Sequence, residues 1–269
     1  MKVANKVVVV TGAGSGMGRE LTLALLRKGA RVAAVDLNEA TLKETIALAG
    51  QSGDKISSHV ANVSDRQAVE ALPSAVIAAH GAVDGIINNA GIIQPFVRLN
   101  DLQYDAIERV INVNLYGVIY MSKAFLPYLL ARPAAHIVNI SSMGGFFPVP
   151  GQTVYGASKA GVKLLTEGLY AELLETNVRV TIVFPGAIAT NITQNSGVAI
   201  ERPTADDAAQ SFPMTSAEDA AEMIIDGMER DRFQVYVGRD AKMMNLFYRF
   251  SPKRATQFMY SRMKELLQG

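Results

Sequence analysis

Short runs of β-branched and apolar residues recur along the chain, separated by turn residues. They lack the polar alternation of a half-exposed strand, which indicates strands that are buried on both faces. Seven runs predict strands at Lys6–Val10, Arg31–Asp36, Lys55–Val60, Val83–Asn88, Ala135–Ser141, Val178–Phe184 and Phe233–Gly238. Strands of this kind are typical of parallel sheets that helices cover on both sides.

Longer stretches between these runs have apolar residues at helical spacing. In the first stretch Met17, Leu21 and Leu25 share one face, and Lys28-Gly29 is a typical helix end. Alternating strands and helices form right-handed βαβ units. The sequence therefore predicts a single α/β domain of Rossmann type, with a doubly wound, mainly parallel seven-stranded sheet and helices on both faces.

The alternation loosens in two places. Residues 191–215 are rich in Asn, Thr, Gly, Pro and Asp, and so long a loop inside a domain is usually functional or mobile. Ser216, followed by two acidic residues, predicts a helix directly after it. Beyond residue 240, Ala241–Phe250 and Lys253–Gln268 have helical spacing, and we expect 241–269 to be a helical extension and not an independent domain. The second of these helices has one apolar face, formed by Ala255, Phe258, Met259, Met263 and Leu266.

Composition excludes several classes of protein. Lys and Arg number 26 against 25 Asp and Glu, and a net charge of +1 argues against nucleic acid as the main partner. The absence of cysteine removes disulfide scaffolds and thiolate chemistry, and three dispersed histidines, His59, His80 and His136, do not suggest a metal centre. The sequence shows no secretory leader pattern and no apolar run long enough for a membrane span, so we expect a cytoplasmic protein.

A glycine-rich loop connects the first predicted strand to the first helix. The loop is Thr11-Gly12-Ala13-Gly14-Ser15-Gly16-Met17-Gly18, and it lies where a dinucleotide pyrophosphate would meet the helix N-terminus. Its glycines have no Cβ that would block a close approach of the backbone to the phosphates. Asp36 ends the second strand, where a carboxylate accepts hydrogen bonds from the ribose hydroxyls of NAD and repels a 2′-phosphate. Positions 15 and 37 lack the Arg or Lys that would favour NADP. The loop and Asp36 therefore favour NAD.

Several motifs together resemble those of the short-chain dehydrogenase/reductase family. The first two are Gly12-x-x-x-Gly16-x-Gly18 and, after the fourth strand, Asn88-Asn89-Ala90-Gly91. Then follow, in order, Val113-Asn114-Leu115, Ser141-Ser142, Tyr155-Gly156-Ala157-Ser158-Lys159 and Pro185-Gly186-Ala187-Ile188-Ala189-Thr190. The resemblance covers roughly residues 5–240. Asn62 departs from the aspartate that the family often has before Val63, which affects only the expected affinity for adenine.

The resemblance implies a catalytic set of Asn114, Ser142, Tyr155 and Lys159. Tyr155 would exchange a proton with the substrate oxygen, and Ser142 would hydrogen-bond that oxygen. Lys159, one helical turn after Tyr155, would lower the pKa of Tyr155 and hold the nicotinamide ribose, and Asn114 would position Lys159 through water. The expected cofactor-binding residues are Gly12, Ser15, Gly16, Met17, Gly18, Asp36, Asn62, Val63, Asn89, Ala90, Gly91, Tyr155, Lys159, Pro185, Gly186, Ile188 and Thr190. We expect no metal site.

The Tyr-x-x-x-Lys pattern occurs a second time, at Tyr260 and Lys264. Tyr155 is preferred because Ser142 precedes it at the family spacing, whereas Phe247 occupies the corresponding position before Tyr260. We therefore interpret Tyr260 and Lys264 as a surface or packing pair.

The resemblance also places the substrate pocket between residues 143–152 and a lid over residues 191–215. Its apolar members favour a lipophilic secondary alcohol or ketone; they are Phe146, Phe147, Val149, Pro150, Phe212, Pro213 and Met214. We expect an NAD-dependent alcohol dehydrogenase or ketone reductase, with residues 1–240 as the catalytic domain, in a homo-oligomer (dimer or tetramer). Two alternatives stay open, an NADPH-dependent 3-oxoacyl reductase and a non-catalytic NAD-binding sensor or scaffold. Asp36 argues against the first, and the complete catalytic set argues against the second.

The near-neutral net charge conceals a strong division along the chain. Residues 201–231 carry nine acidic and two basic side chains, and residues 232–269 carry eight basic and two acidic ones. A basic amphipathic tail is typical of contact with an anionic membrane surface or of packing against the same or a partner subunit. We favour packing.

Overall fold

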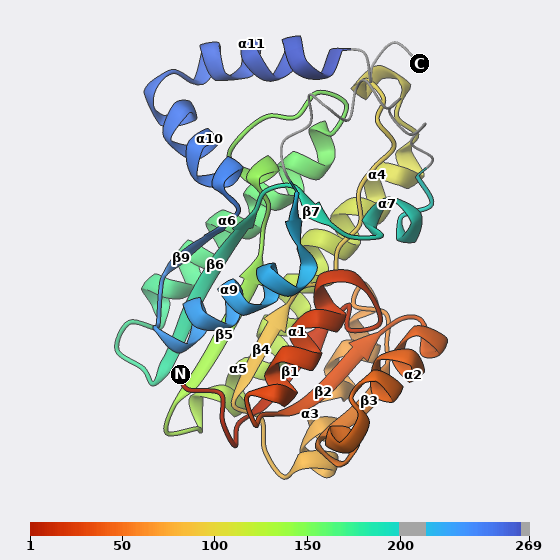
Figure 1. The fold of residues 1–269 in the computed structure, drawn as a ribbon, viewed down its shortest axis with the longest axis vertical. Helices are drawn as coiled ribbons and strands as arrows, with labels where there is room; N and C mark the ends of the chain where they lie inside the picture. Colours follow the sequence, from red (N-terminus) through yellow and green to blue (C-terminus); the bar gives the residue numbers. More distant parts are fainter. Residues whose placement is uncertain (199–213, 265–269) are drawn as a thin grey trace.

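The computed structural model describes residues 1–198 and 214–264 (Figure 1). Seven parallel strands form one sheet in the order β3-β2-β1-β4-β5-β6-β9. They are β1 (Val7–Thr11), β2 (Arg31–Asp36), β3 (Ile56–Val60), β4 (Gly85–Asn88), β5 (Ala135–Ile140), β6 (Val178–Pro185) and β9 (Gln234–Val237). The predicted Rossmann-type single domain is confirmed, and all seven predicted runs form strands whose ends shift by at most two residues.

Helices cover both faces of this sheet (Figure 1). The described helices are α1 (Gly16–Arg27), α2 (Glu39–Leu48), α3 (Arg66–His80), α4 (Tyr104–Ile111), α5 (Gly117–Leu130), α6 (Thr153–Glu172), α7 (Ile192–Asn195), α9 (Ala217–Glu229), α10 (Arg239–Phe250) and α11 (Pro252–Met263). Of these, α7, α10 and α11 lie beyond the carboxyl edge of the sheet (Figure 1). Two predicted boundaries have the expected caps. Gly29 follows the end of α1 with a φ of +81°, and the Ser216 hydroxyl accepts the Asp219 amide at 2.9 Å at the start of α9.

Strand β1 explains why the predicted runs lack polar alternation. Successive side chains of a strand point to opposite faces of the sheet. Val8 and Val10 enter a core that α1 and α9 complete, whereas Val7 and Val9 enter a second core with α3 and α5. Because both faces are buried, no solvent-facing position is left for a polar side chain.

The parallel strands direct the predicted site residues to one edge of the sheet. Strand β1 pairs with both β2 and β4, so the strand order reverses on either side of β1. In open α/β sheets a ligand crevice forms beyond the carboxyl ends of the strands at this point. Gly12 directly follows β1, and Asp36 is the last residue of β2. Asn89 directly follows β4, and Ser142 lies two residues beyond the end of β5.

The predicted lid begins and ends beside a small sheet that the sequence did not predict. Strand β7 (Ile188–Ala189) pairs in parallel with β8 (Thr215–Ser216), and α7 follows β7 within three residues. Residues 199–213 of the predicted lid lie outside the described residues. This range includes Phe212 and Pro213 of the expected substrate pocket.

The C-terminal extension forms two helices, as predicted, and α11 begins at Pro252. Ala255 and Met259 of the predicted apolar face are buried in a cluster with Phe147 and Met244. Leu266 lies outside the described residues. Among the helices that the structure describes, none has the length and apolar character to cross a membrane. The division of the chain at residue 240 stays a prediction.

Candidate active site

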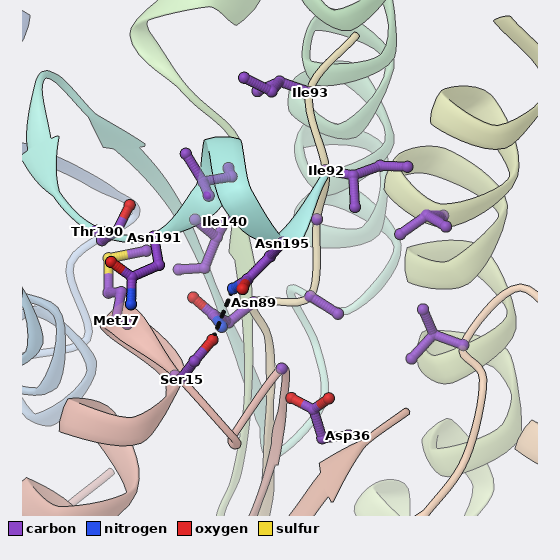
Figure 2. Close-up of a pocket in the computed structure, with 18 of the residues that line it drawn as sticks. Ser15, Met17, Asp36, Asn89, Ile92, Ile93, Ile140, Thr190, Asn191 and Asn195 are labelled. Atoms are coloured by element: carbon purple, nitrogen blue, oxygen red, sulfur yellow. Dashed lines mark hydrogen bonds between the residues drawn. The ribbon is translucent and has the colours of Figure 1, made fainter. Parts of the chain in front are cut away.

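A cavity of about 520 Å³ runs along the carboxyl edge of the sheet. Figure 2 shows Met17 beside Thr190 at the left of the view, Ser15 below Asn195, and Asp36 at the lower right; all five residues line the cavity. All the residues that the sequence assigns to cofactor binding line this cavity: Gly12, Ser15, Gly16, Met17, Gly18, Asp36, Asn62, Val63, Asn89, Ala90, Gly91, Tyr155, Lys159, Pro185, Gly186, Ile188 and Thr190. Ser142 lines it as well, whereas Tyr260 and Lys264 do not.

The glycine-rich loop has the conformation and the free donors that a pyrophosphate requires. Gly12 and Gly16 have φ angles of +69° and +50°, which favour glycine. A Cβ on Gly18 would lie 1.9 Å from the Gly12 carbonyl oxygen, so the loop and α1 meet without space for a side chain. Ser15 precedes α1 but its side chain makes no capping hydrogen bond. Within the part of the chain that the structure describes, the first amides of α1 therefore have no side-chain acceptor, and a phosphate oxygen fits there.

Asp36 presents its carboxylate to the same cavity. Its Oδ2 accepts the Gly14 amide at 2.9 Å and its Oδ1 accepts the Asn38 amide at 3.0 Å, so the backbone fixes its orientation. Each carboxylate oxygen keeps a lone pair for a further donor. Among the described residues that line the cavity, Asp36 and Lys159 are the only charged ones.

Asn89 connects the glycine-rich loop to β4. Its Nδ2 donates to the Thr11 carbonyl oxygen at 2.9 Å, and its backbone amide donates to the Thr11 hydroxyl at 3.0 Å. The Ala90 amide donates to the same hydroxyl at 3.0 Å. These bonds hold the two central strand ends together beneath the cavity.

Three of the four predicted catalytic residues meet at the other side of the cavity. Ser142 follows β5, and its hydroxyl accepts the Gly144 amide at 3.0 Å. Tyr155 and Lys159 are one turn apart on α6, with the Lys159 Nζ 6.0 Å from the centre of the Tyr155 ring. The Lys159 Nζ donates to the Ile140 carbonyl oxygen at 3.0 Å. Burial lowers the pKa of Lys159 to about 8.

The acidity of Tyr155 differs from the expectation. Burial raises the pKa of the phenol, and only the neighbouring Ser142 hydroxyl acts in the opposite direction. The expected lowering by Lys159 is absent here, because the Lys159 Nζ donates to the Ile140 carbonyl oxygen and not to the phenol. At neutral pH the isolated site therefore holds Tyr155 as a neutral phenol, which is the proton-donating form.

Asn114 lies behind the cavity wall in a π-helical turn, Asn112–Tyr116, and is fully buried. Its Oδ1 accepts the Ile92 amide and its Nδ2 donates to the Ile92 carbonyl, both at 2.9 Å. A Cβ on Gly91 would lie 3.3 Å from the Asn114 Oδ1 and 3.2 Å from the Lys159 Nζ, so these two side chains flank Gly91. The role of Asn114 toward Lys159 stays a prediction, since its direct partners are Ile92 and Ser158.

Helix α7 attaches to the site by contacts that the sequence did not predict. The Asn195 Nδ2 donates to the Ser15 hydroxyl at 2.8 Å, across the mouth of the cavity (Figure 2). The Ser196 hydroxyl accepts the Ile93 amide at 2.9 Å, and Arg109 donates to the Ser196 carbonyl oxygen. No local motif marks Asn195, because its partner is distant in the sequence.

Gln94 is a second residue that sequence reasoning missed. It is fully buried, and its Oε1 accepts the amides of Val154 and Tyr155, each at 2.9 Å. Its Nε2 donates to the Gly151 carbonyl at 2.9 Å. Gln152 at the N-cap of α6 makes no capping bond, so Gln94 caps this helix from a distant loop. It thereby fixes the backbone of Tyr155.

Replacement of Gln94 by leucine is expected to lower the free energy of unfolding by about 1–3 kcal/mol, because two partly buried amides lose their acceptor. Gln103→Leu is the matched control, since Gln103 also precedes a helix, is exposed, and makes no capping bond. Urea unfolding of both variants measures the difference. Equal losses for the two variants would show that the Gln94 cap does not stabilise α6.

Comparisons with known proteins agree with this geometry. Residues 6–200 match the family described as short chain dehydrogenase. A Mycobacterium tuberculosis protein named "Putative oxidoreductase SadH" is 39% identical over 249 residues, covering 91% of this chain and 90% of that protein. The 3-oxoacyl-(acyl-carrier-protein) reductase FabG of Thermotoga maritima is 38% identical over 196 residues, covering 72% of this chain and 78% of FabG.

A solved structure gives the same result for the fold. A short chain dehydrogenase/reductase from Burkholderia phymatum, determined in complex with NAD, has a TM-score of 0.80 and 28% sequence identity, with 88% of this chain and 90% of that chain covered. The chain therefore belongs to the short-chain dehydrogenase/reductase family, whose members bind NAD or NADP, and it is an oxidoreductase of that type.

Proposed function

We propose that this protein is an NAD-dependent oxidoreductase that interconverts a lipophilic secondary alcohol and its ketone. One observation carries the proposal: a single cavity extends from the Asp36 carboxylate to Ser142 and Tyr155. Asp36 ends β2 and Ser142 follows β5, and three strand spacings, about 14 Å, separate these strands in the sheet. A dinucleotide laid along this edge would bring its nicotinamide end to Tyr155.

Asp36 supports NAD over NADP. A ribose with free hydroxyls donates hydrogen bonds to the carboxylate, whereas a 2′-phosphate would meet a negative charge at the same place. The described lining residues beside Asp36 include Leu37, Asn38 and Thr41, none of which carries a compensating positive charge. The related Burkholderia phymatum structure contains NAD, which agrees with the proposal.

The residues around Tyr155 suit proton transfer to and from a substrate oxygen. NAD, when bound, supplies the acceptor of the hydride from the carbinol carbon. In alcohol oxidation Tyr155 Oη accepts the hydroxyl proton, and in ketone reduction it donates one. The Ser142 hydroxyl donates a hydrogen bond to the substrate oxygen, and Lys159 holds the hydroxyls of the nicotinamide ribose.

The side of the cavity next to Ser142 favours a lipophilic substrate. Ile92, Ile93 and Ile140 line the cavity. Phe146 and Phe147, which the sequence assigned to the substrate pocket, do not line it and pack into hydrophobic clusters of the fold instead. The described lining offers Lys159 as its only cation, so it lacks a second positive charge that would clamp a carboxylate or phosphate.

Exposed apolar side chains on α5 and α6, such as Tyr128 and Leu164, support the homo-oligomer that we propose.

Replacement of Asp36 by asparagine tests the choice of cofactor. Asparagine keeps an acceptor for the Gly14 amide but removes the charge, so the ratio of kcat/KM with NAD to kcat/KM with NADP is expected to fall at least tenfold. Asp54→Asn, at an exposed position outside the cavity, is the control for net charge. An unchanged ratio in Asp36→Asn would refute the proposed role of this carboxylate.

Reduction of a 3-oxoacyl group is the second candidate, because FabG of Thermotoga maritima is a relative. Asp36 argues against it only if the reductase requires NADPH. A panel of secondary alcohols and ketones, including cyclic, steroidal and 3-oxoacyl compounds, separates the two by kcat/KM with each cofactor. NAD-dependent turnover of simple lipophilic alcohols supports the first proposal, and a preference for 3-oxoacyl compounds with NADPH replaces it. Binding of NADH without any turnover indicates a sensor.

A further inference from the structure

Helix α10 exposes an apolar stripe. Met243, Leu246 and Phe250 are 52%, 58% and 81% exposed, and their spacing of three and four residues places them on one side of the helix. The other side of the helix holds Ala241 and Met244, which are buried. Neighbouring exposed apolar side chains that are surrounded by polar residues mark interaction sites.

Basic side chains border the stripe. Arg239, Lys242 and Arg249 are exposed on α10, and Lys253 and Arg254 are exposed in the first turn of α11. None of these five forms an ion pair with another described residue. The one acidic residue in α10 and α11 does not neutralise them, because its side chain is buried and accepts the Ala187 amide at 2.7 Å.

We propose that the α10 stripe and its bordering cations dock this protein on an anionic lipid surface. In such a contact the apolar side chains enter the headgroup region while lysine and arginine reach the lipid phosphates. The charge favours this partner over a second copy of the chain. A twofold contact through the same stripe would bring identical rows of cations together.

The position of α10 in the fold links the proposed lipid contact to the active site. The α10 and α11 helices pack on Met143 and Phe147, which follow Ser142 within five residues. The Phe147 and Tyr248 rings are 6.0 Å apart. The docked surface therefore adjoins the segment that leads to the reacting groups, so that a lipid-dissolved substrate would enter from the bilayer. Docking itself requires neither cofactor nor substrate, so its test is independent of the proposed function.

Partitioning of the full chain onto vesicles tests the proposal. The vesicles are made of phosphatidylcholine alone or mixed with phosphatidylglycerol, at low and at high salt. We expect strong binding only to the mixed vesicles at low salt, since salt screens exposed charges. Leu246→Ser/Phe250→Ser and Lys242→Gln/Arg249→Gln are each expected to lower the partition coefficient about tenfold or more. Lys55→Gln/Lys123→Gln removes the same charge from exposed positions elsewhere and is expected to bind like the wild type.

Three outcomes would overturn the proposal. The first is equal binding to neutral and mixed vesicles, or no binding to either. The second is an equal loss in both double charge variants, which would show that only net charge matters. The third is unchanged partitioning of Leu246→Ser/Phe250→Ser together with a smaller oligomer in analytical ultracentrifugation, which would assign the stripe to a second copy. Circular dichroism of each variant confirms that the fold is retained.

Discussion

Replacing Tyr155 with phenylalanine is expected to lower kcat for alcohol oxidation by about a thousandfold, within the range that a positioned acid or base contributes. The change removes one oxygen atom and leaves the ring in place, so the cavity keeps its shape. The structure shows that no second phenol substitutes for it, because within the described residues Tyr155 is the only tyrosine that lines the cavity. NADH titration, followed by fluorescence, is expected to give nearly the wild-type Kd.

The second Tyr-x-x-x-Lys motif supplies the matched control. Tyr260→Phe makes the same chemical change on α11, where Tyr260 is half exposed and outside the cavity. It is expected to retain wild-type kcat. Comparable losses in the two variants would point to a general effect on stability, and full activity in Tyr155→Phe would remove Tyr155 from the proposed proton transfer.

Replacing Lys159 with methionine is expected to abolish activity and yet to stabilise the protein at neutral pH by about 2 kcal/mol. Burial holds the pKa of Lys159 at about 8 in the folded protein, against an ordinary value of 10.5. The difference corresponds to about 3 kcal/mol that folding loses in order to bury the ammonium. Methionine removes this cost, and the lost hydrogen bond to the Ile140 carbonyl returns about 1 kcal/mol of it.

The pH dependence gives this prediction its sign. Because the folded pKa is lowered, the unfolded chain binds the extra proton between pH 8 and pH 10.5. The cost is therefore complete below pH 8 and disappears as the pH rises to 10.5, so the stability of the wild type rises toward that of Lys159→Met over this range. Urea unfolding of both proteins at several pH values measures the difference between them.

Lys163→Met serves as the control for this experiment. Lys163 lies one turn further along α6, and its Nζ pairs with Glu167 at 2.8 Å near the surface. Its removal is expected to leave the stability difference from the wild type nearly constant between pH 7 and pH 10. A constant difference for Lys159→Met as well would mean that the Lys159 ammonium carries no burial cost.

The fold could be predicted from the sequence because its signals are local. A strand buried on both faces leaves an unbroken apolar run, as at Val7–Val10, and a glycine that no side chain can replace, such as Gly18, leaves a motif. Many of the residues that line the cavity were predicted through motifs of this kind, whereas others, such as Thr41, Ile92 and Asn195, were not. Their presence around one cavity agrees with the expected site, and their individual roles stay proposals.

The missed features depend on contacts between distant residues. Gln94 caps the helix of Tyr155 from 61 residues away, and Asn195 reaches Ser15 across 180 residues. No local pattern encodes either pairing, because the fold brings the partners together. The pKa of Tyr155 was misjudged for the same reason, since burial and the hydrogen bond of Lys159 to Ile140 belong to the folded protein and not to the motif.

The strands that lead to the two ends of the cavity also differ in local stability. Strand β3 is an edge strand with none of its residues buried, and it leads to Asn62, whereas β5 is interior and wholly buried and leads to Ser142. Edges of a sheet open more often than its interior, so local unfolding is expected to reach first the end of the cavity that we propose for adenine. The groups that we propose for proton transfer are attached to the most stable part of the sheet. The end proposed to bind only the nucleotide is attached to the part that unfolds locally most often.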